Sequence, residues 1–401
     1  MCKPILCCMR GSMTMESKEI VIMNTRKCPI CGGGYSCIAP VNMELPVGYH
    51  LDGAIKGVVC DICGCCFAAS RSREDDYEYY YTNSNFYAGN PISNNLAMEV
   101  IEEIIRLSDD LVRKDGAICD MGFGSGKLLK AFKLRGYSNL AGIDPSEDSV
   151  KNLKDEISNV SQGSIYEYQS ALADQFDLIT VVDVLEHLYN PHQALETVGK
   201  YLKKGGYLAL SVPCFDHIDE NPNFLPDNFN QEHINYFSSV ALDNLLSLVG
   251  FEPEKKKELQ KVELVAVYRK NDVSAFDNST LKRDVDTVER IKRYFKEQDK
   301  FLQSVDRRFN DLWNKGVRHL YVWGVGAFTM YLVANSRIAD FDLHFVDGNP
   351  QKQGTEYMGK NVESPESIVE DWPIVICAMH SIEPIKVAIK AMGLQNGVVN
   401  F

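Results

Sequence analysis

The sequence predicts an α/β protein in three parts: a Rossmann-like core, a zinc-ribbon-like unit of four cysteines before it, and a Rossmann-like α/β domain after it. Three observations lead to this prediction. A glycine-rich turn follows an apolar strand near residue 120, two cysteine pairs precede it, and a second strand and glycine turn come near residue 320. The expected boundaries are 1–25 for a disordered leader, 26–73 for the cysteine unit, 74–272 for the core and 273–401 for the last domain.

The glycine-rich turn of the core reads Asp-x-Gly-x-Gly-x-Gly from Asp120 to Gly126. The run Lys127–Phe132 continues it as a helix, and the next apolar strand ends at Asp144, followed by Pro145. Glycines let the backbone turn tightly and pass close to a ligand, and an acid that ends the following strand can bind a ribose diol. We therefore expect an adenosine-containing ligand here. A tight turn without a ligand is the alternative that the residues leave open.

The spacing of the glycines distinguishes between adenosine-containing ligands. A dinucleotide fingerprint places its third glycine three residues after the second, whereas here the glycines alternate behind an aspartate. This pattern resembles the first motif of class I S-adenosylmethionine (SAM) methyltransferases. The resemblance implies that Asp120 faces the amino-acid end of SAM and that Asp144 holds its ribose hydroxyls. The cofactor-binding residues that it implies in this segment are Asp120, Gly122, Phe123, Gly124, Gly126, Asp144 and Pro145.

Three downstream segments extend the resemblance. Phe176–Leu188 is an apolar strand that enters an acidic turn with a histidine, as in the family's fourth motif. Tyr201–Pro213 reads as a helix end, a Gly-Gly stop and a buried strand. Gln231–Ser238 carries a Glu-His-x-x-Tyr-Phe-Ser signature that is shared with a narrower group. The fourth motif adds three implied cofactor-binding residues, Asp183, Val184 and Leu185.

Four of the thirteen cysteines form two Cys-x-x-Cys-Gly knuckles. Each knuckle directs two thiolates at one point, and two knuckles supply the tetrahedral four-thiolate set that zinc prefers. Such a site is closed, so the metal is expected to stabilise the fold and not to catalyse. Redox-active pairs and disulfides are the alternatives, and Cys37, Cys65 and Cys66 complicate the choice of ligands. The expected zinc ligands are Cys28, Cys31, Cys60 and Cys63.

Composition limits the classes of function. The formal net charge of −13 argues against a protein that follows nucleic-acid phosphates. No apolar run approaches the roughly 20 residues that span a bilayer, and the first residues lack the features of a secretory signal. We therefore expect a cytoplasmic protein that binds neither nucleic acid nor membrane, as a monomer or small homo-oligomer.

Two further regions flank the core motifs. The acidic and tyrosine-rich stretch Arg71–Asn90 is expected to be a connector whose aromatic side chains pack over the core, with a substrate mouth as the alternative. The last domain begins with a charged helical run, Leu281–Trp313, followed by a strand and glycine turn at His319–Ala327. Thr329 stands where a dinucleotide fingerprint needs its third glycine, so an NAD site is not expected there.

Taken together, this order of parts resembles the sugar C-methyltransferases of deoxysugar pathways. The segment Asp347–Gly354 is similar to that family's Asp-x-Asn-Pro-x-Lys-x-Gly, and the likeness covers nearly all of residues 26–401. Members of the family methylate a carbon beside the keto group of a nucleotide-linked sugar. The resemblance implies that the nucleotide of such a substrate lies between the core and the last domain.

The same resemblance suggests catalytic residues. Removing a proton beside a carbonyl requires a base and a donor that stabilises the enolate oxygen. His233 is the candidate base, Glu232 orients the site, and His187 occupies the position of the family's second active-site histidine. The family's Tyr-His-Glu-His becomes Asn230-Gln231-Glu232-His233 here. The tyrosine is therefore lost, and an asparagine cannot replace it as an acid or base.

That loss keeps three functions open. The favoured one is a zinc-stabilised SAM-dependent methyltransferase acting on a nucleotide-linked or glycan sugar. The second is an O- or N-methyltransferase acting on a sugar or a small natural-product intermediate, since these acceptors need only base assistance and an in-line approach. The third is a SAM-binding scaffold without turnover.

Overall fold

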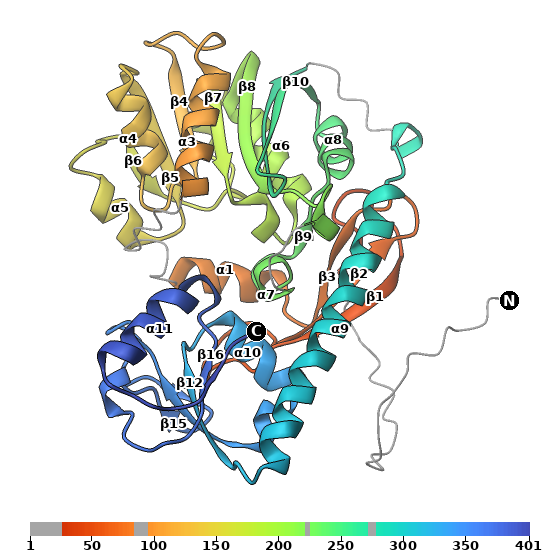
Figure 1. Ribbon diagram of the computed structural model, residues 1–401. Helices are drawn as coiled ribbons and strands as arrows, with labels where there is room; N and C mark the ends of the chain where they lie inside the picture. Colours follow the sequence, from red (N-terminus) through yellow and green to blue (C-terminus); the bar gives the residue numbers. More distant parts are fainter. Residues whose placement is uncertain (1–25, 84–94, 221–224, 272–277) are drawn as a thin grey trace, which may run out of the picture.

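The computed structural model describes residues 26–83, 95–220, 225–271 and 278–401. The expected leader, residues 1–25, lies outside them, as do Phe86 and Tyr87 of the tyrosine-rich stretch. An antiparallel N-terminal sheet, a mostly parallel central sheet and a parallel C-terminal sheet follow one another along the chain (Figure 1). The predicted fold class is thereby confirmed. Within the described residues, no helix has the length and apolar character needed to cross a membrane.

The central sheet has seven strands in the order β10-β11-β8-β7-β4-β5-β6. Neighbours from β8 to β6 run parallel, whereas β11 and β10 extend one edge in antiparallel fashion. The chain proceeds outward from β4 to β6 and then returns to β7 on the other side of β4. Ligands of such sheets bind at the carboxyl ends of the strands beside this switch point. The strands are β4 (Ala117–Met121), β5 (Asn139–Asp144), β6 (Val160–Gln162), β7 (Phe176–Val182), β8 (Leu202–Pro213), β10 (Phe251–Leu259) and β11 (Glu263–Lys270).

Helices cover both faces of the central sheet. One apolar cluster joins the sheet to three helices, and a second joins its other face to two helices and to the cysteine knuckles. The Gly205–Gly206 pair, which was expected to end a helix, lies inside β8 because the preceding helix already ends at Tyr201. The helices are α3 (Asn95–Ser108), α4 (Lys127–Leu134) and α5 (Glu147–Leu153) on one face, and α6 (Pro191–Tyr201) and α8 (Ser239–Leu248) on the other.

The N-terminal sheet is completed by a strand from the core segment. β1 (Tyr35–Asn42), β2 (Ala54–Cys60) and β3 (Cys66–Ser70) form an antiparallel meander, and β9 (Asn235–Tyr236) pairs with β3. Where the sequence suggested a connector, residues Glu74–Asn83 form helix α1, and a short helix α7 spans Leu225–Asn228. The cysteine unit and the core therefore share a sheet, and the expected boundary at residue 73 remains a prediction.

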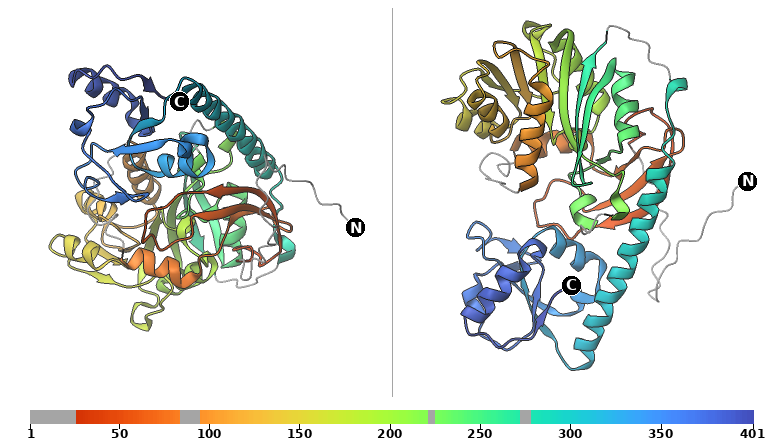
Figure 2. Two further views of the ribbon diagram at one scale, coloured as in Figure 1. Left: turned by 90° about the horizontal axis from the view of Figure 1, so that it is seen from below. Right: turned by 45° about the horizontal axis from the view of Figure 1, so that its top comes forward.

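The C-terminal sheet has the order β13-β12-β16-β17 and is parallel throughout. α9 and α10 pack against one face of it, and α11 packs against the other. In two views α9 runs along the side of the molecule from the N-terminal sheet to this domain (Figures 1 and 2). The elements are α9 (Asp286–Asn314), β12 (His319–Trp323), α10 (Ala327–Asn335), β13 (Asp342–Val346), β14 (Glu356–Tyr357), β15 (Lys360–Asn361), β16 (Ile374–Ile376), α11 (Ile382–Ala391) and β17 (Val398–Val399).

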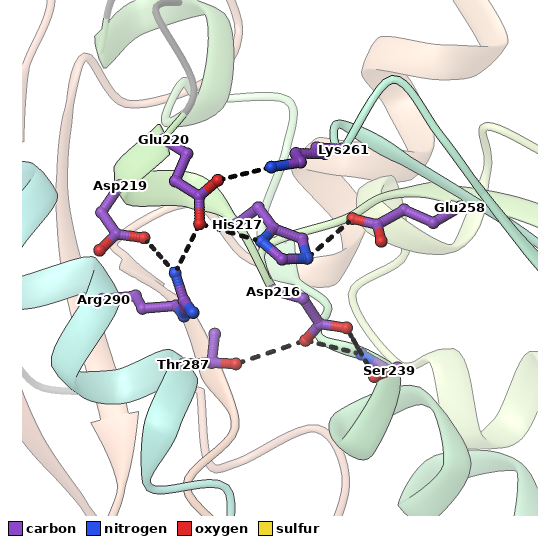
Figure 3. Close-up of polar contacts among 9 residues, drawn as sticks. All are labelled: Asp216, His217, Asp219, Glu220, Ser239, Glu258, Lys261, Thr287 and Arg290. Atoms are coloured by element: carbon purple, nitrogen blue, oxygen red, sulfur yellow. Dashed lines mark hydrogen bonds and ion pairs between the residues drawn. The ribbon is translucent and has the colours of Figure 1, made fainter.

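A polar network fixes the start of α9 to the core (Figure 3). Asp216 accepts hydrogen bonds from the hydroxyls of Ser239 at 2.6 Å and Thr287 at 3.4 Å, and so joins α8 to α9. Arg290 of α9 pairs with Asp219 at 2.7 Å. The orientation of the last domain is thus set partly by charge pairs at the base of its long helix. The network is completed by His217, Glu220, Glu258 and Lys261.

A buried arginine joins the N-terminal unit to two loops of the core. Arg26 donates to Tyr189 O at 2.8 Å, Leu188 O at 3.0 Å and Ile234 O at 3.0 Å, and to Asn235 Oδ1 at 2.5 Å. Its partners are neutral, and burial lowers the pKa of its guanidinium. The two loops, after residues 187 and 233, are therefore held together through a side chain from the start of the cysteine unit.

We expect Arg26→Met to lower the free energy of unfolding by about 2–4 kcal/mol. Tyr189 O and Asn235 Oδ1 would each lose a buried donor, and an unpaired buried polar group costs about 1–3 kcal/mol. Urea denaturation followed by circular dichroism measures the change. Arg71→Met is the control, because that side chain is 60% exposed in a surface pair with Asp52. Equal shifts in the two variants would contradict the special role of Arg26.

Candidate active site

The glycine turn after β4 has a backbone that side chains would disturb. Gly122 has a φ of 82°, and a Cβ there would come within 2.6 Å of Val184 Cγ2. Gly126, with a φ of 73°, precedes α4, and a Cβ there would come within 2.5 Å of Leu153. These two glycines therefore allow the turn to pass directly against the loop after β7 and against α5.

Two aspartates stand at neighbouring strand ends beside this turn. Asp144 accepts backbone N–H groups from Gly124 at 2.8 Å and Ser146 at 2.9 Å, and burial raises its pKa. Asp120 accepts the hydroxyl of Thr180 at 2.7 Å, and burial raises its pKa to about 7. A cation that binds next to these carboxyls would be favoured, because it would offset the cost of keeping them ionised.

A cavity of about 850 Å³ opens at this edge of the sheet. Its size is within the range of small-molecule sites. Two of the residues expected to bind cofactor, Gly126 and Leu185, do not line it, since Gly126 caps α4 and Leu185 is fully buried in the core. The expected cofactor residues that do line it are Asp120, Gly122, Phe123, Gly124, Asp144, Pro145, Asp183 and Val184.

The cavity is strongly acidic. Among the described residues that line it, Lys127 is the single lysine or arginine, against eight carboxyl side chains. SAM carries a positive sulfonium and a positive ammonium group, so the sign of this lining fits it. The carboxyl residues are Glu74, Glu78, Asp120, Asp144, Glu167, Asp183, Glu186 and Glu263.

The structure brings the two expected catalytic histidines together in the wall of this cavity. His187 ends the short helix η2 (Leu185–His187), His233 lies just before β9, and their ring centroids are 4.8 Å apart. Burial lowers the pKa of both rings, and the neighbouring His187 helps to lower that of His233 to about 3. Both imidazoles are therefore neutral at pH 7, and each has a nitrogen lone pair.

Glu232 lies behind the histidines and does not line the cavity. Its Oε1 accepts the hydroxyl of Tyr49 at 2.9 Å and that of Tyr80 at 2.8 Å. Its backbone oxygen lies 3.1 Å from His187 Nδ1. Glu232 thus connects the loop of the N-terminal sheet and helix α1 to the ring of His187.

The tyrosines of α1 take part in the site, which the favoured packing interpretation did not anticipate. The hydroxyl of Tyr81 lies 2.8 Å from His187 Nδ1, and both Tyr77 and Tyr81 line the cavity. Tyr77 is 3% exposed, so for this residue packing remains a sufficient explanation. Sequence reasoning considered these residues as a possible substrate mouth but had no periodicity that separated one tyrosine from the next.

Asn230, where the chain departs from the tyrosine of the family it resembles, shapes the loop that carries His233. Its Oδ1 accepts the backbone N–H groups of Glu232 at 2.9 Å and His233 at 2.8 Å. Its Nδ2 donates to Pro226 O at 3.3 Å. Its polar atoms are thus used within the loop, and it does not line the cavity.

The four expected zinc ligands form one cluster. Sγ atoms of opposite knuckles lie 3.6 Å apart for Cys28 and Cys63, and 3.4 Å apart for Cys31 and Cys60. A tetrahedral zinc with Zn–S bonds of about 2.3 Å requires sulfurs about 3.8 Å apart, so the donor set fits the ion. A disulfide requires about 2.05 Å. Cys37, Cys65 and Cys66 lie outside the cluster.

Comparisons with known proteins match the core segment of the chain to methyltransferases. Residues 94–256 match the family model described as "Methyltransferase domain". The ubiquinone biosynthesis O-methyltransferase of Dechloromonas aromatica is 28% identical over 142 residues, which cover 34% of this chain and 58% of that protein. The enzyme of the same name from Psychrobacter arcticus is 31% identical over 155 residues, covering 33% and 58%. The chain spans little more than half the length of these curated relatives.

The solved structures to which the chain is similar include a SAM-dependent methyltransferase from Mesorhizobium loti. It is 16% identical, covers 41% of this chain and 96% of that chain, and has a TM-score of 0.35. The family match identifies residues 94–256 as a methyltransferase domain.

We expect one zinc ion per chain in protein purified under reducing conditions, measured by inductively coupled plasma mass spectrometry. Cys63→Ser should remove it and lower the thermal midpoint by more than about 4 °C, because metal binding contributes to folding. Cys37→Ser is the control, since this thiol is exposed on β1 and outside the cluster. Reduced wild-type protein without metal would contradict the four-thiolate site.

Proposed function

Because residues 94–256 form a class I SAM-dependent methyltransferase domain, we propose that this chain transfers a methyl group from SAM to a nucleotide-linked or glycan sugar. The transfer is to a carbon beside a carbonyl group. The observation that carries the proposal is the pair His187 and His233, which face each other in the wall of the cavity that also contains the glycine turn.

The cofactor end of the cavity supports SAM as the methyl donor. When bound, SAM supplies an electrophilic methyl group on a positively charged sulfur. The acidic lining attracts that charge, and the turn from Gly122 to Gly126 brings the backbone close to the ligand. Asp144, at the end of β5, accepts the ribose hydroxyls with the lone pairs that its two backbone donors leave.

The acceptor end supports proton removal. His233 is neutral at pH 7, and among the described residues no hydrogen-bond partner holds its ring, so a ring nitrogen can accept the proton of the acceptor. The hydroxyl of Tyr81 lies in the same wall as a donor for a developing negative charge. Glu232 fixes the backbone that orients both histidines.

The last domain is proposed to hold the nucleotide of the substrate. Its glycine turn is closed by Asp347, whose Oδ2 accepts Val325 N at 2.8 Å, and by Lys352, whose Nζ donates to Val325 O at 2.7 Å. Both residues belong to the Asp-x-Asn-Pro-x-Lys-x-Gly segment. A glycine turn at the carboxyl end of a parallel strand is where such sheets bind ligands.

A second candidate is an O- or N-methyltransferase acting on a sugar or small natural-product intermediate. The curated relatives named above are O-methyltransferases, which favours a hydroxyl acceptor. A SAM-binding scaffold without turnover is the third candidate. Incubating the protein with labelled SAM and a panel of nucleotide-linked keto and hydroxy sugars tests all three. NMR then locates the new methyl group on carbon, oxygen or nitrogen, and SAM binding without any transfer would favour the scaffold.

We expect Asp144→Ala to weaken SAM binding by about ten-fold or more, measured by isothermal titration calorimetry. A hydrogen bond to a charged group contributes about 1.5–3 kcal/mol, and about 1.4 kcal/mol corresponds to ten-fold. Glu147→Ala is the matched control, because this carboxyl is exposed on α5 and does not line the cavity. If SAM causes no heat of binding to the wild-type protein, both transferase proposals fail.

We expect His233→Ala to reduce methyl transfer by at least about 100-fold, the usual contribution of acid–base catalysis, while SAM affinity changes little. Asp144 and the glycine turn are unaltered in this variant. His192→Ala on α6 is the matched control and should retain full transfer, since His192 does not line this cavity. A His233→Ala protein that keeps most of its rate would remove His233 from the mechanism.

A further inference from the structure

Three side chains in the acceptor end of the cavity are arranged as ligands of a metal ion. A carboxylate oxygen of Glu186, a ring nitrogen of His187 and a ring nitrogen of His233 all lie within 4.8 Å of one another. All three residues line the cavity. Two imidazoles and one carboxylate, with further positions open, form a set of donors typical of divalent transition metals.

The carboxyl of Glu186 has no partner that accounts for its burial. The residue is 2% exposed, and its Oε2 has no hydrogen-bond partner among the described residues. Its Oε1 lies 3.7 Å from His187 Nε2. A buried carboxylate without a partner is costly, and it is ordinarily paired with a charge or coordinated to a metal.

A second buried carboxyl beside Glu186 also has an oxygen without a hydrogen-bond partner among the described residues. Glu263, at the start of β11, is 6% exposed, and its Oε1 also lacks a partner among the described residues. It lies beside the carboxyls of Asp183 and Glu186. Among the described residues that line the cavity the single lysine is Lys127, the first residue of α4 after the glycine turn. Three carboxyl groups thus lie close together, and no described lysine or arginine forms an ion pair with them.

The ring of His187 is oriented for coordination. Its Nδ1 lies 3.1 Å from the carbonyl oxygen of Glu232, which can only accept a hydrogen bond. The Tyr81 hydroxyl adds a second contact to Nδ1 at 2.8 Å. In the tautomer with its hydrogen on Nδ1, the ring donates to this carbonyl oxygen and presents the lone pair of Nε2, which lies 3.7 Å from Glu186 Oε1. Metal-bound histidines are commonly held by such a bond from the other ring nitrogen.

We propose that Glu186, His187 and His233 bind a divalent first-row transition-metal ion, whose open positions face the cavity and take an oxygen of the acceptor. The binding of the ion goes beyond the proposed function, whereas its part in catalysis rests on that function. With the ion bound, His233 is a ligand and not the base. The ion would polarise the acceptor oxygen and so make the neighbouring proton more acidic, and the carboxylate of Asp183, which lines the same cavity, would accept that proton.

Another candidate cluster in the chain serves as an internal control. His319, Asp342 and His344 also bring their ligand atoms within 4.8 Å of one another, at the start of β12 and β13. There, Lys360 already pairs with Asp342, and Trp372 stacks on His319 at 4.5 Å. These side chains are 42%, 48% and 35% exposed. A lysine neutralises the carboxylate, so this cluster is expected to bind metal less well.

Manganese titration of the full chain tests the proposal, after a brief wash with chelator has removed metal from nitrogen and oxygen ligands and the protein retains one zinc per chain, in its cysteine cluster. Mn²⁺ prefers oxygen and nitrogen donors, so it leaves the thiolate site occupied by zinc. Loss of the free Mn²⁺ signal in electron paramagnetic resonance should show one ion bound per chain. Glu186→Gln, which keeps the shape of the side chain, and His233→Ala should each weaken binding by at least about 10–100-fold. His344→Ala should leave it unchanged. Thermal midpoints and zinc content show that each variant is folded.

The possible outcomes separate the two proposals. Mn²⁺ that fails to bind the zinc-filled wild-type protein overturns the metal site, as does binding that Glu186→Gln retains and His344→Ala loses. A His233→Ala protein that still binds Mn²⁺ but has lost methyl transfer also overturns it, and leaves His233 as the base. Mn²⁺ binding that depends on Glu186, in a protein to which SAM does not bind, supports the metal site and removes the proposed function.

Discussion

The arrangement of the candidate site depends on the buried guanidinium of Arg26. It is the donor for two loops that are far apart in sequence, one directly after His187 and one directly after His233. Asn235 strengthens the same connection by donating to Leu185 O and Leu188 O at 2.8 Å. A charge surrounded by neutral acceptors is costly to bury, and its several hydrogen bonds offset that cost. A residue of the cysteine unit therefore helps to hold together the two loops that carry the histidines.

This dependence gives the four-cysteine cluster a role in the site without contact with a substrate. The cluster packs beside α6, and the N-terminal sheet receives β9, shortly after His233, as its fourth strand. Tyr49 from the same unit and Tyr80 from α1 hold the carboxylate of Glu232. A metal that stabilises this unit would thus stabilise the geometry of the histidines. The four-cysteine unit and the methyltransferase domain together form the candidate site, although their sequence motifs lie far apart in the chain.

Whether a feature of the fold or of the candidate site can be predicted from the sequence depends on how far apart in the chain its interacting residues lie. The glycine turn and the cysteine knuckles are local patterns in which spacing alone fixes the geometry, so the sequence predicts the cofactor end and the four-thiolate cluster. The alternation of strands and helices likewise predicts the α/β architecture of the core and of the last domain. The contacts of Arg26 and Tyr49 span more than 160 residues, and nothing in their neighbours indicates a partner. The unpaired state of Glu186 is likewise a property of the packed fold.

The structure changes the interpretation of Asn230, which replaces the tyrosine of the family that the chain resembles. The sequence suggested that its absence removes a phenol from the site and changes the acceptor. The side chain of Asn230 instead closes its own loop by binding the N–H groups of Glu232 and His233. A phenol still reaches the histidines, since Tyr81 of α1 contacts His187. Asn230 is therefore weak support for an unusual acceptor, and the choice between carbon and oxygen depends on the groups that face the cavity. Those groups are two neutral imidazoles beside buried carboxyls. Such a set can hold an ion that binds an oxygen of the acceptor, or it can accept a proton from the acceptor.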